Sequence, residues 1–213
     1  MPDTRLVLVR HGQSEATVQQ VVGGHGGCTG LSPLGRNQAE ALRERLSRTG
    51  LLRDATVLLA SVLPRAVETA EIIGPAVGDG GLAVVQDCDL CEVHPGEGDG
   101  LTWTDFLARY GEPRWDTDPA VPLSPGGESL LVFRERVSIA LRRLAGAYPG
   151  QLVVVACHGG VIVESMFALG GMRPEGRPAR LEPANTGITV WSRDEDVGER
   201  WRLDSYNDTA HLD

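Results

Sequence analysis

The chain has 213 residues, 41% of them hydrophobic, and a formal net charge of −9, which is typical of a globular protein rather than a disordered one. The acidic balance argues against a general nucleic-acid binder. All 20 basic residues are arginines, so P-loop and Schiff-base lysine chemistry are excluded. No apolar run approaches the ~20 residues of a membrane span, and Met1-Pro2-Asp3 does not resemble the start of an export signal. We therefore expect a cytoplasmic protein with no membrane or nucleic-acid partner.

Apolar strands alternate with helices along the chain. In chain order, the pattern predicts a strand at 6–9, a helix from Ser32 to Gly50, a strand at 57–60, a helix from Leu63, a weak strand at 82–85, a short helix at 104–110, a long helix at 130–144, a strand at 152–157 and a helix at 161–169. Segments 186–191 and 200–203 are expected to form a hairpin around the acidic turn 193–199. Such alternation predicts an α/β sandwich with a mostly parallel central sheet.

Three side chains that suit anion chemistry are placed at one edge of this sheet. His11 follows the first strand, His158 follows the most apolar strand, and Arg65 opens the helix after another strand. Ligands of parallel sheets bind beyond the carboxyl ends of the strands. We therefore expect these three side chains to lie close together.

Several short motifs support a more specific interpretation. In order they are Arg10-His11-Gly12, the helix start Leu31–Ala39, Arg65–Ala70, Leu90-Cys91-Glu92, Gly126–Ser129 and His158-Gly159-Gly160. The ordered set resembles the histidine phosphatase superfamily, also called the phosphoglycerate mutase-like family. The resemblance covers Arg5 to Leu212 and implies a single domain over 1–213. It also implies a three-layer sandwich with helices on both faces of the sheet and a lid or insert near 94–125.

The resemblance also implies roles for individual residues. His11 would be the nucleophile that forms a phosphohistidine, and Glu92 the general acid and base. Arg10, Arg65 and His158 would bind the phosphoryl group, for which arginine is suited because its planar guanidinium bonds two oxygens at once. Attack requires a neutral His11 ring whose other nitrogen donates, we expect, to a backbone carbonyl. Because these fixed groups neutralise the phosphoryl oxygens, we expect no metal and no cofactor.

Some positions leave alternatives open. Glu97 and Asp99 compete with Glu92 for the acid role, and we prefer Glu92 because it directly follows a strand-like pair. Many family members carry a phosphate-binding Asn where this chain has Thr17, whose hydroxyl can donate one hydrogen bond but lacks the reach of an amide. Thr17 and Gly159 are therefore kept as candidate substrate-binding residues.

The loop after Glu92 also departs from the family pattern, which usually has an aromatic residue between two glycines. Here the stretch 94–100 reads HPGEGDG, and Trp103 comes later. This difference affects the shape of the pocket rather than the chemistry. Of the four aromatic residues that follow, we expect packing against one another, with stacking on a substrate ring as the alternative: Trp103, Phe106, Tyr110 and Trp115.

Cys88 and Cys91 form a CxxC pair, with His94 three residues later. Such a pair could be redox-active or could be half of a zinc site. A structural zinc usually needs a second pair of ligands, and we find none at a suitable local spacing. Free thiols are therefore the favoured interpretation, and His25 and His94 are expected in solvent or at the rim of the pocket.

Within the family, the sequence favours a phosphatase over a mutase. The segment between Glu92 and His158 is short for a cofactor-dependent phosphoglycerate mutase, and the Trp-Asn and Phe-Thr-Gly-Trp stretches of those enzymes are missing. We predict a metal-independent phosphomonoesterase that acts on a small phosphorylated metabolite. The alternatives are a mutase-like phosphotransferase and a non-catalytic phospho-ligand-binding relative. The arginine-rich composition without lysine is typical of a GC-rich bacterial genome, and no pattern indicates an oligomeric state.

Overall fold

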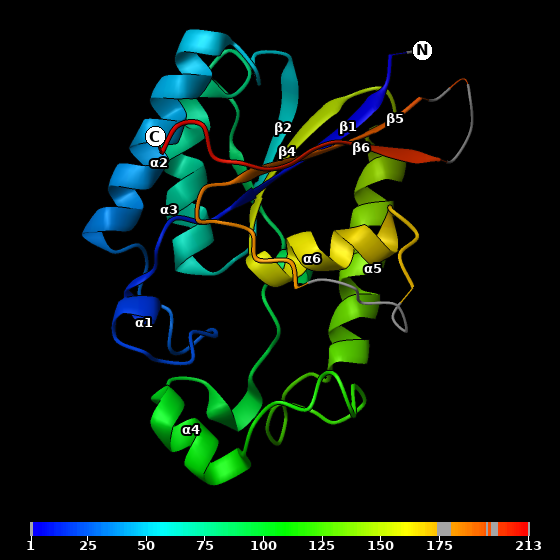
Figure 1. Ribbon diagram of the computed structural model, residues 1–213. Coiled ribbons are helices and arrows are strands. Elements are labelled where there is room, and N and C mark those ends of the chain that lie inside the picture. The colour runs from blue at the N-terminus through cyan, green and yellow to red at the C-terminus, as the bar shows by residue number, and fades with distance from the viewer. Residues whose placement is uncertain (1, 174–179, 195, 197–199, 213) are drawn as a thin grey trace.

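A six-stranded sheet forms the centre of the molecule in this computed structural model, which describes residues 2–173, 180–194, 196 and 200–212. Its strands are β1 (Thr4–Arg10), β2 (Ala55–Ala60), β3 (Val84–Gln86), β4 (Leu152–Cys157), β5 (Ile188–Arg193) and β6 (Trp201–Asp208). They lie in the order β3-β2-β4-β1-β5-β6 (Figure 1). The first four are parallel, whereas β5 and β6 run antiparallel as the expected hairpin. The mostly parallel sheet is confirmed; the expected turn at 193–199 falls largely outside the described residues.

Helices cover both faces of the sheet and complete the three layers (Figure 1). On one side lie α2 (Pro33–Thr49) and α3 (Pro64–Ile73), and on the other α5 (Leu130–Ala147) and α6 (Gly159–Ala168). Shorter elements are α1 (Glu15–Val18), α4 (Trp103–Tyr110), and the 3-10 turns Gly74–Ala76, Cys88–Leu90 and Gly96–Gly98. Among the described helices, none has the length and apolar character that a bilayer crossing requires.

The buried strands explain why their sequences are apolar without interruption. Alternate residues of β1 point to opposite faces: Leu6 and Leu8 join the core under α5 and α6, whereas Val7 and Val9 join the core under α2 and α3. β4 is buried along its whole length. A strand covered on both faces needs apolar residues at every position, and such strands hold their end residues in fixed positions.

The start of α2 shows how local sequence places a loop beside the sheet edge. Ser32 caps the helix by accepting from the Gly35 N–H at 3.1 Å, and Pro33 occupies the first turn. Gly35 packs against the loop after β1, because a Cβ on Gly12 would lie only 2.3 Å from the Gly35 carbonyl oxygen. The helix ends at Gly50, which has a φ of 65°. The predicted helix is confirmed at both ends.

The segment 94–125 lies beyond the carboxyl ends of the strands, with α4 at its outer side (Figure 1). One of its carboxylates, Asp99, accepts hydrogen bonds from the backbone N–H groups of Gly24, Gly26 and Gly27 at 2.6–2.9 Å. This contact fastens the segment to the loop that follows β1. The expected aromatic packing is found for Trp103, Phe106 and Tyr110. Trp115 instead packs against the core beside α5 and α6, so its expected place among the other three is wrong.

Candidate active site

His11 lies at the carboxyl end of β1, where its side chain is only 6% exposed. Its backbone N–H donates to the Cys157 carbonyl at the end of β4, so two neighbouring strands fix its position. The Nδ1 atom lies 2.6 Å from the Gly12 carbonyl oxygen. Because a carbonyl can only accept, Nδ1 must carry the proton and Nε2 keeps its lone pair. The ring is therefore held in the tautomer expected for a nucleophile.

Arg65 connects the two histidines at the strand ends. It occupies the first turn of α3, which begins at Pro64, and it is 5% exposed. Its Nε donates to Nε2 of His11 at 3.1 Å and approaches Nδ1 of His158 at 3.3 Å. One Nη atom donates to the Gly23 carbonyl at 2.7 Å. The guanidinium thus lies against both imidazoles, as the strand-end arrangement predicts.

His158 follows β4 and is fully buried. Its Nδ1 accepts from Arg65, so its Nε2 carries the proton and donates to the Ser61 hydroxyl at 2.6 Å. The ring centroids of His158 and His11 lie 5.0 Å apart. The three groups expected at one sheet edge are therefore in mutual contact.

Both imidazoles are held neutral by their surroundings. Burial lowers the pKa of His11 and of His158 well below the usual range, and the positive charge of Arg65 lowers both further. A neutral imidazole has a free lone pair, whereas an imidazolium has none. Both rings therefore stay neutral at pH 7, and Nε2 of His11 keeps the lone pair that accepts from Arg65.

This electrostatic arrangement predicts an unusual titration. In the folded protein, the His11 ring should remain neutral when the pH passes through 6.5, the ordinary histidine value. Below pH 6.5 these histidine rings are protonated in the unfolded chain but stay neutral in the folded chain. The free energy of unfolding should therefore fall as the pH drops below 6.5. NMR of the ring protons measures the titration, with the denatured chain as the reference. A His11 resonance that titrates at or above 6.5 would contradict this account.

Arg10 supplies a second guanidinium at the end of β1. One Nη atom donates to the Pro183 carbonyl, whereas Nε is buried and has no hydrogen-bond partner in the described part of the chain. Burial lowers the pKa of Arg10 and the Glu92 carboxylate opposes that effect, but a guanidinium stays charged at neutral pH in either case. A buried donor without a partner is costly. Nε of Arg10 therefore retains one hydrogen-bond donor at this edge.

Glu92 reaches the same region from the segment after β3. Its Oε2 accepts from the backbone N–H of Gly160 at 3.0 Å, in the first turn of α6. A Cβ on Gly160 would lie 2.1 Å from Oε1 of Glu92, so glycine is needed for this approach. Gly159 lies beside the Arg10 side chain, whose Nε would be 3.6 Å from a Cβ at that position. Glu92 thus lies at the start of α6, where its charge acts on Arg10, and Gly159 lies beside the Arg10 side chain.

The other acidic candidates are engaged elsewhere. Asp99 holds backbone N–H groups of the loop after β1, and Glu97 lies 3.4 Å from the Tyr110 hydroxyl. Thr17, the substrate-binding candidate on α1, is exposed, and its hydroxyl lies 2.9 Å from the Ser14 hydroxyl. Its partner is within the same turn rather than among the histidines.

Three residues that support the site escape the sequence analysis as site residues. Ser61, directly after β2, bonds His158; Thr69 accepts from the Gly12 N–H at 3.1 Å; and the Asn185 amide donates to the His11 carbonyl at 2.9 Å. The position of Ser61 at a strand end and the spacing of Thr69 one helical turn after Arg65 are signals that could have found them. No local pattern marks Asn185.

Comparison with known proteins decides the family. A sequence profile of the histidine phosphatase superfamily (branch 1) matches residues 6–209, nearly the whole chain. The chain belongs to the histidine phosphatase superfamily. The resemblance inferred from the ordered motifs is confirmed, and the described fold is that of this superfamily.

Relatives of this histidine phosphatase include both mutases and phosphatases. It is 32% identical to phosphoglycerate mutase-like protein 4 of Arabidopsis thaliana, over 98% of this chain and 86% of the relative. It is 34% identical to a 2,3-bisphosphoglycerate-dependent phosphoglycerate mutase of Brucella anthropi, over 87% and 89% of the two chains. The native structure of a mycobacterial glucosyl-3-phosphoglycerate phosphatase matches with a TM-score of 0.78 at 31% identity, over 96% and 99%. The chain is accordingly an enzyme of the superfamily.

Proposed function

We propose that this enzyme is a phosphomonoesterase that hydrolyses a small phosphorylated metabolite through a phosphohistidine on His11. The observation that carries the proposal is the neutral, buried ring of His11, whose Nε2 faces Arg65. The unpartnered Nε of Arg10 supplies a further donor at the same edge. Together these groups offer a nucleophile and two cations where an anionic phosphoryl group would lie.

The first chemical step transfers the phosphoryl group to the enzyme. Nε2 of His11 attacks phosphorus, the bond from phosphorus to the ester oxygen breaks, and Glu92, which enters this step in its acid form, gives its proton to the departing alkoxide. A phosphoryl oxygen replaces the histidine nitrogens as acceptor for Arg65. Because the Ser61 hydroxyl can either donate or accept, the His158 ring can then take the tautomer with its proton on Nδ1, accept from Ser61 at Nε2 and donate a hydrogen bond to the substrate while it keeps that proton.

The second step returns the enzyme to its starting state. Glu92, now a carboxylate, takes a proton from water as the water oxygen attacks phosphorus, and the bond to His11 breaks. Inorganic phosphate leaves and Nε2 regains its lone pair. No metal ion or cofactor takes part in either step.

The position of Glu92 can be tested through Gly160. Replacement by alanine places a methyl group 2.1 Å from Oε1 of Glu92 and 3.0 Å from a ring carbon of Phe133, and the flexible carboxylate, which is the nearer group, should be displaced most. We expect kcat to fall by about 10²-fold for an alkyl phosphate and less for an aryl phosphate, whose leaving group needs little protonation. The matched control is Gly146→Ala on α5, where a Cβ meets nothing within 4 Å. Equal losses for both substrates would contradict the acid role.

The segment 94–125 is proposed as a lid within a single domain that spans 1–213. Two observations support the lid: Asp99 accepts hydrogen bonds from the backbone of the loop after β1, and the segment lies beyond the ends of the strands (Figure 1). Thr17 and Gly159 remain proposed contacts to the substrate. The four cysteines form no disulfide in the described part of the chain, which fits a reducing compartment, and we propose a bacterial cytoplasmic setting on that ground.

Phosphatase activity is preferred to mutase activity because the segment between Glu92 and His158 is short. A mutase must shield its phosphoenzyme from water and return the group to a second oxygen. Parallel assays of phosphate release from phosphate esters and of 3- to 2-phosphoglycerate conversion separate the two. Release of phosphate without conversion supports the proposal. Conversion that outpaces release would assign a mutase, and binding without turnover would assign a phospho-ligand sensor.

A further inference from the structure

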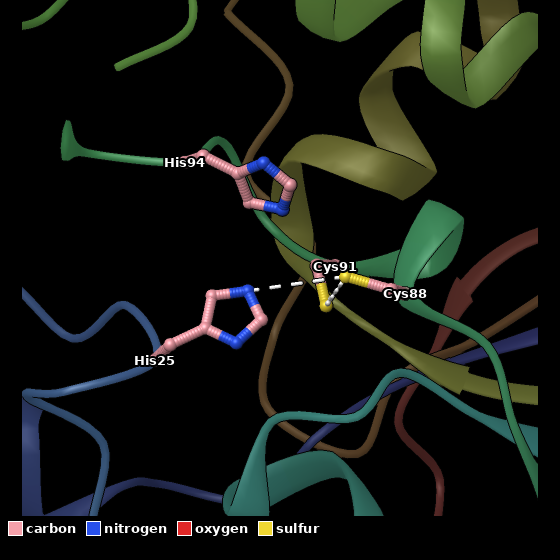
Figure 2. A group of neighbouring side chains, drawn as sticks. All are labelled: His25, Cys88, Cys91 and His94. Carbon is pink, nitrogen blue, oxygen red and sulfur yellow. Dashed lines mark hydrogen bonds between the residues drawn. The ribbon is translucent and has the colours of Figure 1, made fainter. Parts of the chain in front are cut away.

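Two histidines and two cysteines from separate loops come together outside the proposed phosphoryl site. One ligand atom from each of His25, Cys88, Cys91 and His94 lies within 4.8 Å of all the others (Figure 2). Cys88, Cys91 and His94 form the sequence pattern that lacked a fourth ligand. His25 supplies it from a loop 63 residues before Cys88, which is why local spacing could not reveal it.

The distances fit a tetrahedral site before any ion is placed in it. The sulfur atoms of Cys88 and Cys91 lie 3.8 Å apart, and Nε2 of His25 lies 3.9 Å from the Cys88 sulfur. Two thiolates bound to one zinc at ~2.3 Å and at a tetrahedral angle are separated by about 3.8 Å. The sulfurs are thus much farther apart than the ~2.05 Å of a disulfide.

His94 provides a second and independent indication. Its Nε2 is buried, has no hydrogen-bond partner in the described part of the chain, and points toward the cysteines (Figure 2). Its Nδ1 lies on the other side of the ring, 3.7 Å from Oε1 of Glu128. Histidine ligands of metals commonly have a carboxylate beside their second ring nitrogen, which orients the ring. Glu128 is itself held by Arg136 at 2.6 Å.

The ligand types select the metal class. Two thiolates with two imidazoles suit a borderline-soft divalent cation and give a neutral site with Zn²⁺. Four protein ligands leave no position for water or substrate, which is the mark of a structural rather than a catalytic site. His25 and Cys88 are exposed, so an ion can reach the cluster from solvent.

We propose that His25, Cys88, Cys91 and His94 bind one structural Zn²⁺ ion. The ion fastens the loop that carries His25 to the segment 88–94. That loop also provides the Gly23 carbonyl that accepts from Arg65, and the segment carries Glu92. The zinc thus acts as a clamp between two parts of the chain near the strand ends. This proposal does not depend on the phosphatase activity.

The decisive experiment measures metal binding to the full chain, kept reduced with a phosphine. We expect one Zn²⁺ per chain by elemental analysis. Titration of the chelator-treated protein with Co²⁺ should give the intense visible bands of tetrahedral coordination and a thiolate-to-cobalt charge-transfer band. Loss of a residue that only hydrogen-bonds a metal ligand typically weakens metal binding by roughly 10–100-fold. His25→Ala and Cys88→Ser remove a ligand itself and should weaken Zn²⁺ binding by more than that. The thiol control is Cys28→Ser, which should keep the stoichiometry and the spectrum.

Thermal unfolding provides a second readout. Zn²⁺ should raise the Tm of the wild type and of Cys28→Ser, because the ion binds the folded chain in preference to the unfolded one. The same addition should leave the Tm of His25→Ala unchanged, even if that variant is less stable at the outset. A featureless Co²⁺ titration of reduced protein would overturn the proposal, as would a Cys88–Cys91 disulfide in the purified protein or an unaltered Co²⁺ spectrum in His25→Ala.

Discussion

Replacement of His11 by alanine is expected to lower the turnover of an aryl phosphate by at least about 10⁴-fold, since loss of a covalent nucleophile can cost close to 10⁶-fold in other enzymes. The physical reason is that the Gly12 carbonyl holds the ring proton on Nδ1, so Nε2 of His11 keeps the lone pair that attacks phosphorus once Arg65 donates to the phosphoryl group instead. Steady-state phosphate release without added divalent cation measures the effect. Trapping with labelled substrate should reveal a phosphohistidine in the wild type and none in the variant.

Folding of the variant is checked by its circular dichroism and its thermal unfolding. Removing the neutral His11 ring should leave the fold intact, because the backbone N–H of residue 11 still donates to the Cys157 carbonyl at the end of β4. Equal activity of the two proteins would show that His11 is not the nucleophile. An inactive wild type that still forms a phosphohistidine with phosphoglycerate would favour the mutase alternative.

The second large effect is expected at Arg65. Arg65→Lys keeps one positive charge but loses the planar fork, whose Nε meets both imidazoles and whose Nη holds the Gly23 carbonyl. An ammonium group cannot bond two phosphoryl oxygens in that geometry. We expect kcat/KM for the aryl phosphate to fall by about 10³-fold, the range seen for an arginine that stabilises a transferred phosphoryl group. The matched control is Arg53→Lys, an exposed arginine, which should behave as the wild type.

Inhibition by orthovanadate sharpens this test. If Arg65 binds the transferred group, the variant should lose affinity for this oxyanion in parallel with its loss of kcat/KM. A fall in activity with unchanged vanadate affinity would assign Arg65 a purely structural role. A decrease of less than tenfold in kcat/KM would mean that Arg10 and His158 hold the phosphoryl group without it.

The elements that position the site can be read from local patterns. A continuous apolar run predicts a strand buried on both faces, and β4 matches the expected 152–157 range. The ends of α2 are marked by Ser32 and Pro33 at the start and by Gly50 at the end. Each acts within one helical turn: Ser32 caps the first N–H groups, the Pro33 ring fixes φ, and Gly50 adopts the left-handed backbone that ends the helix. Weak patterns gave looser bounds: the expected strand at 82–85 is β3 at Val84–Gln86, with only three residues at the sheet edge.

Local patterns along the chain were enough to predict the layered fold, the family and the meeting of His11, Arg65 and His158 at one edge, because strand ends and first helical turns are local features of parallel sheets. The positions of residues on long loops follow only from the folded chain. There Asp99 bonds the backbone of the loop after β1, the Asn185 amide bonds the His11 carbonyl, and His25 lies beside the two cysteines. Loop paths depend on contacts between distant residues, for which no periodicity exists in the sequence. The burial that keeps both histidines neutral likewise arises only when the layers close over them.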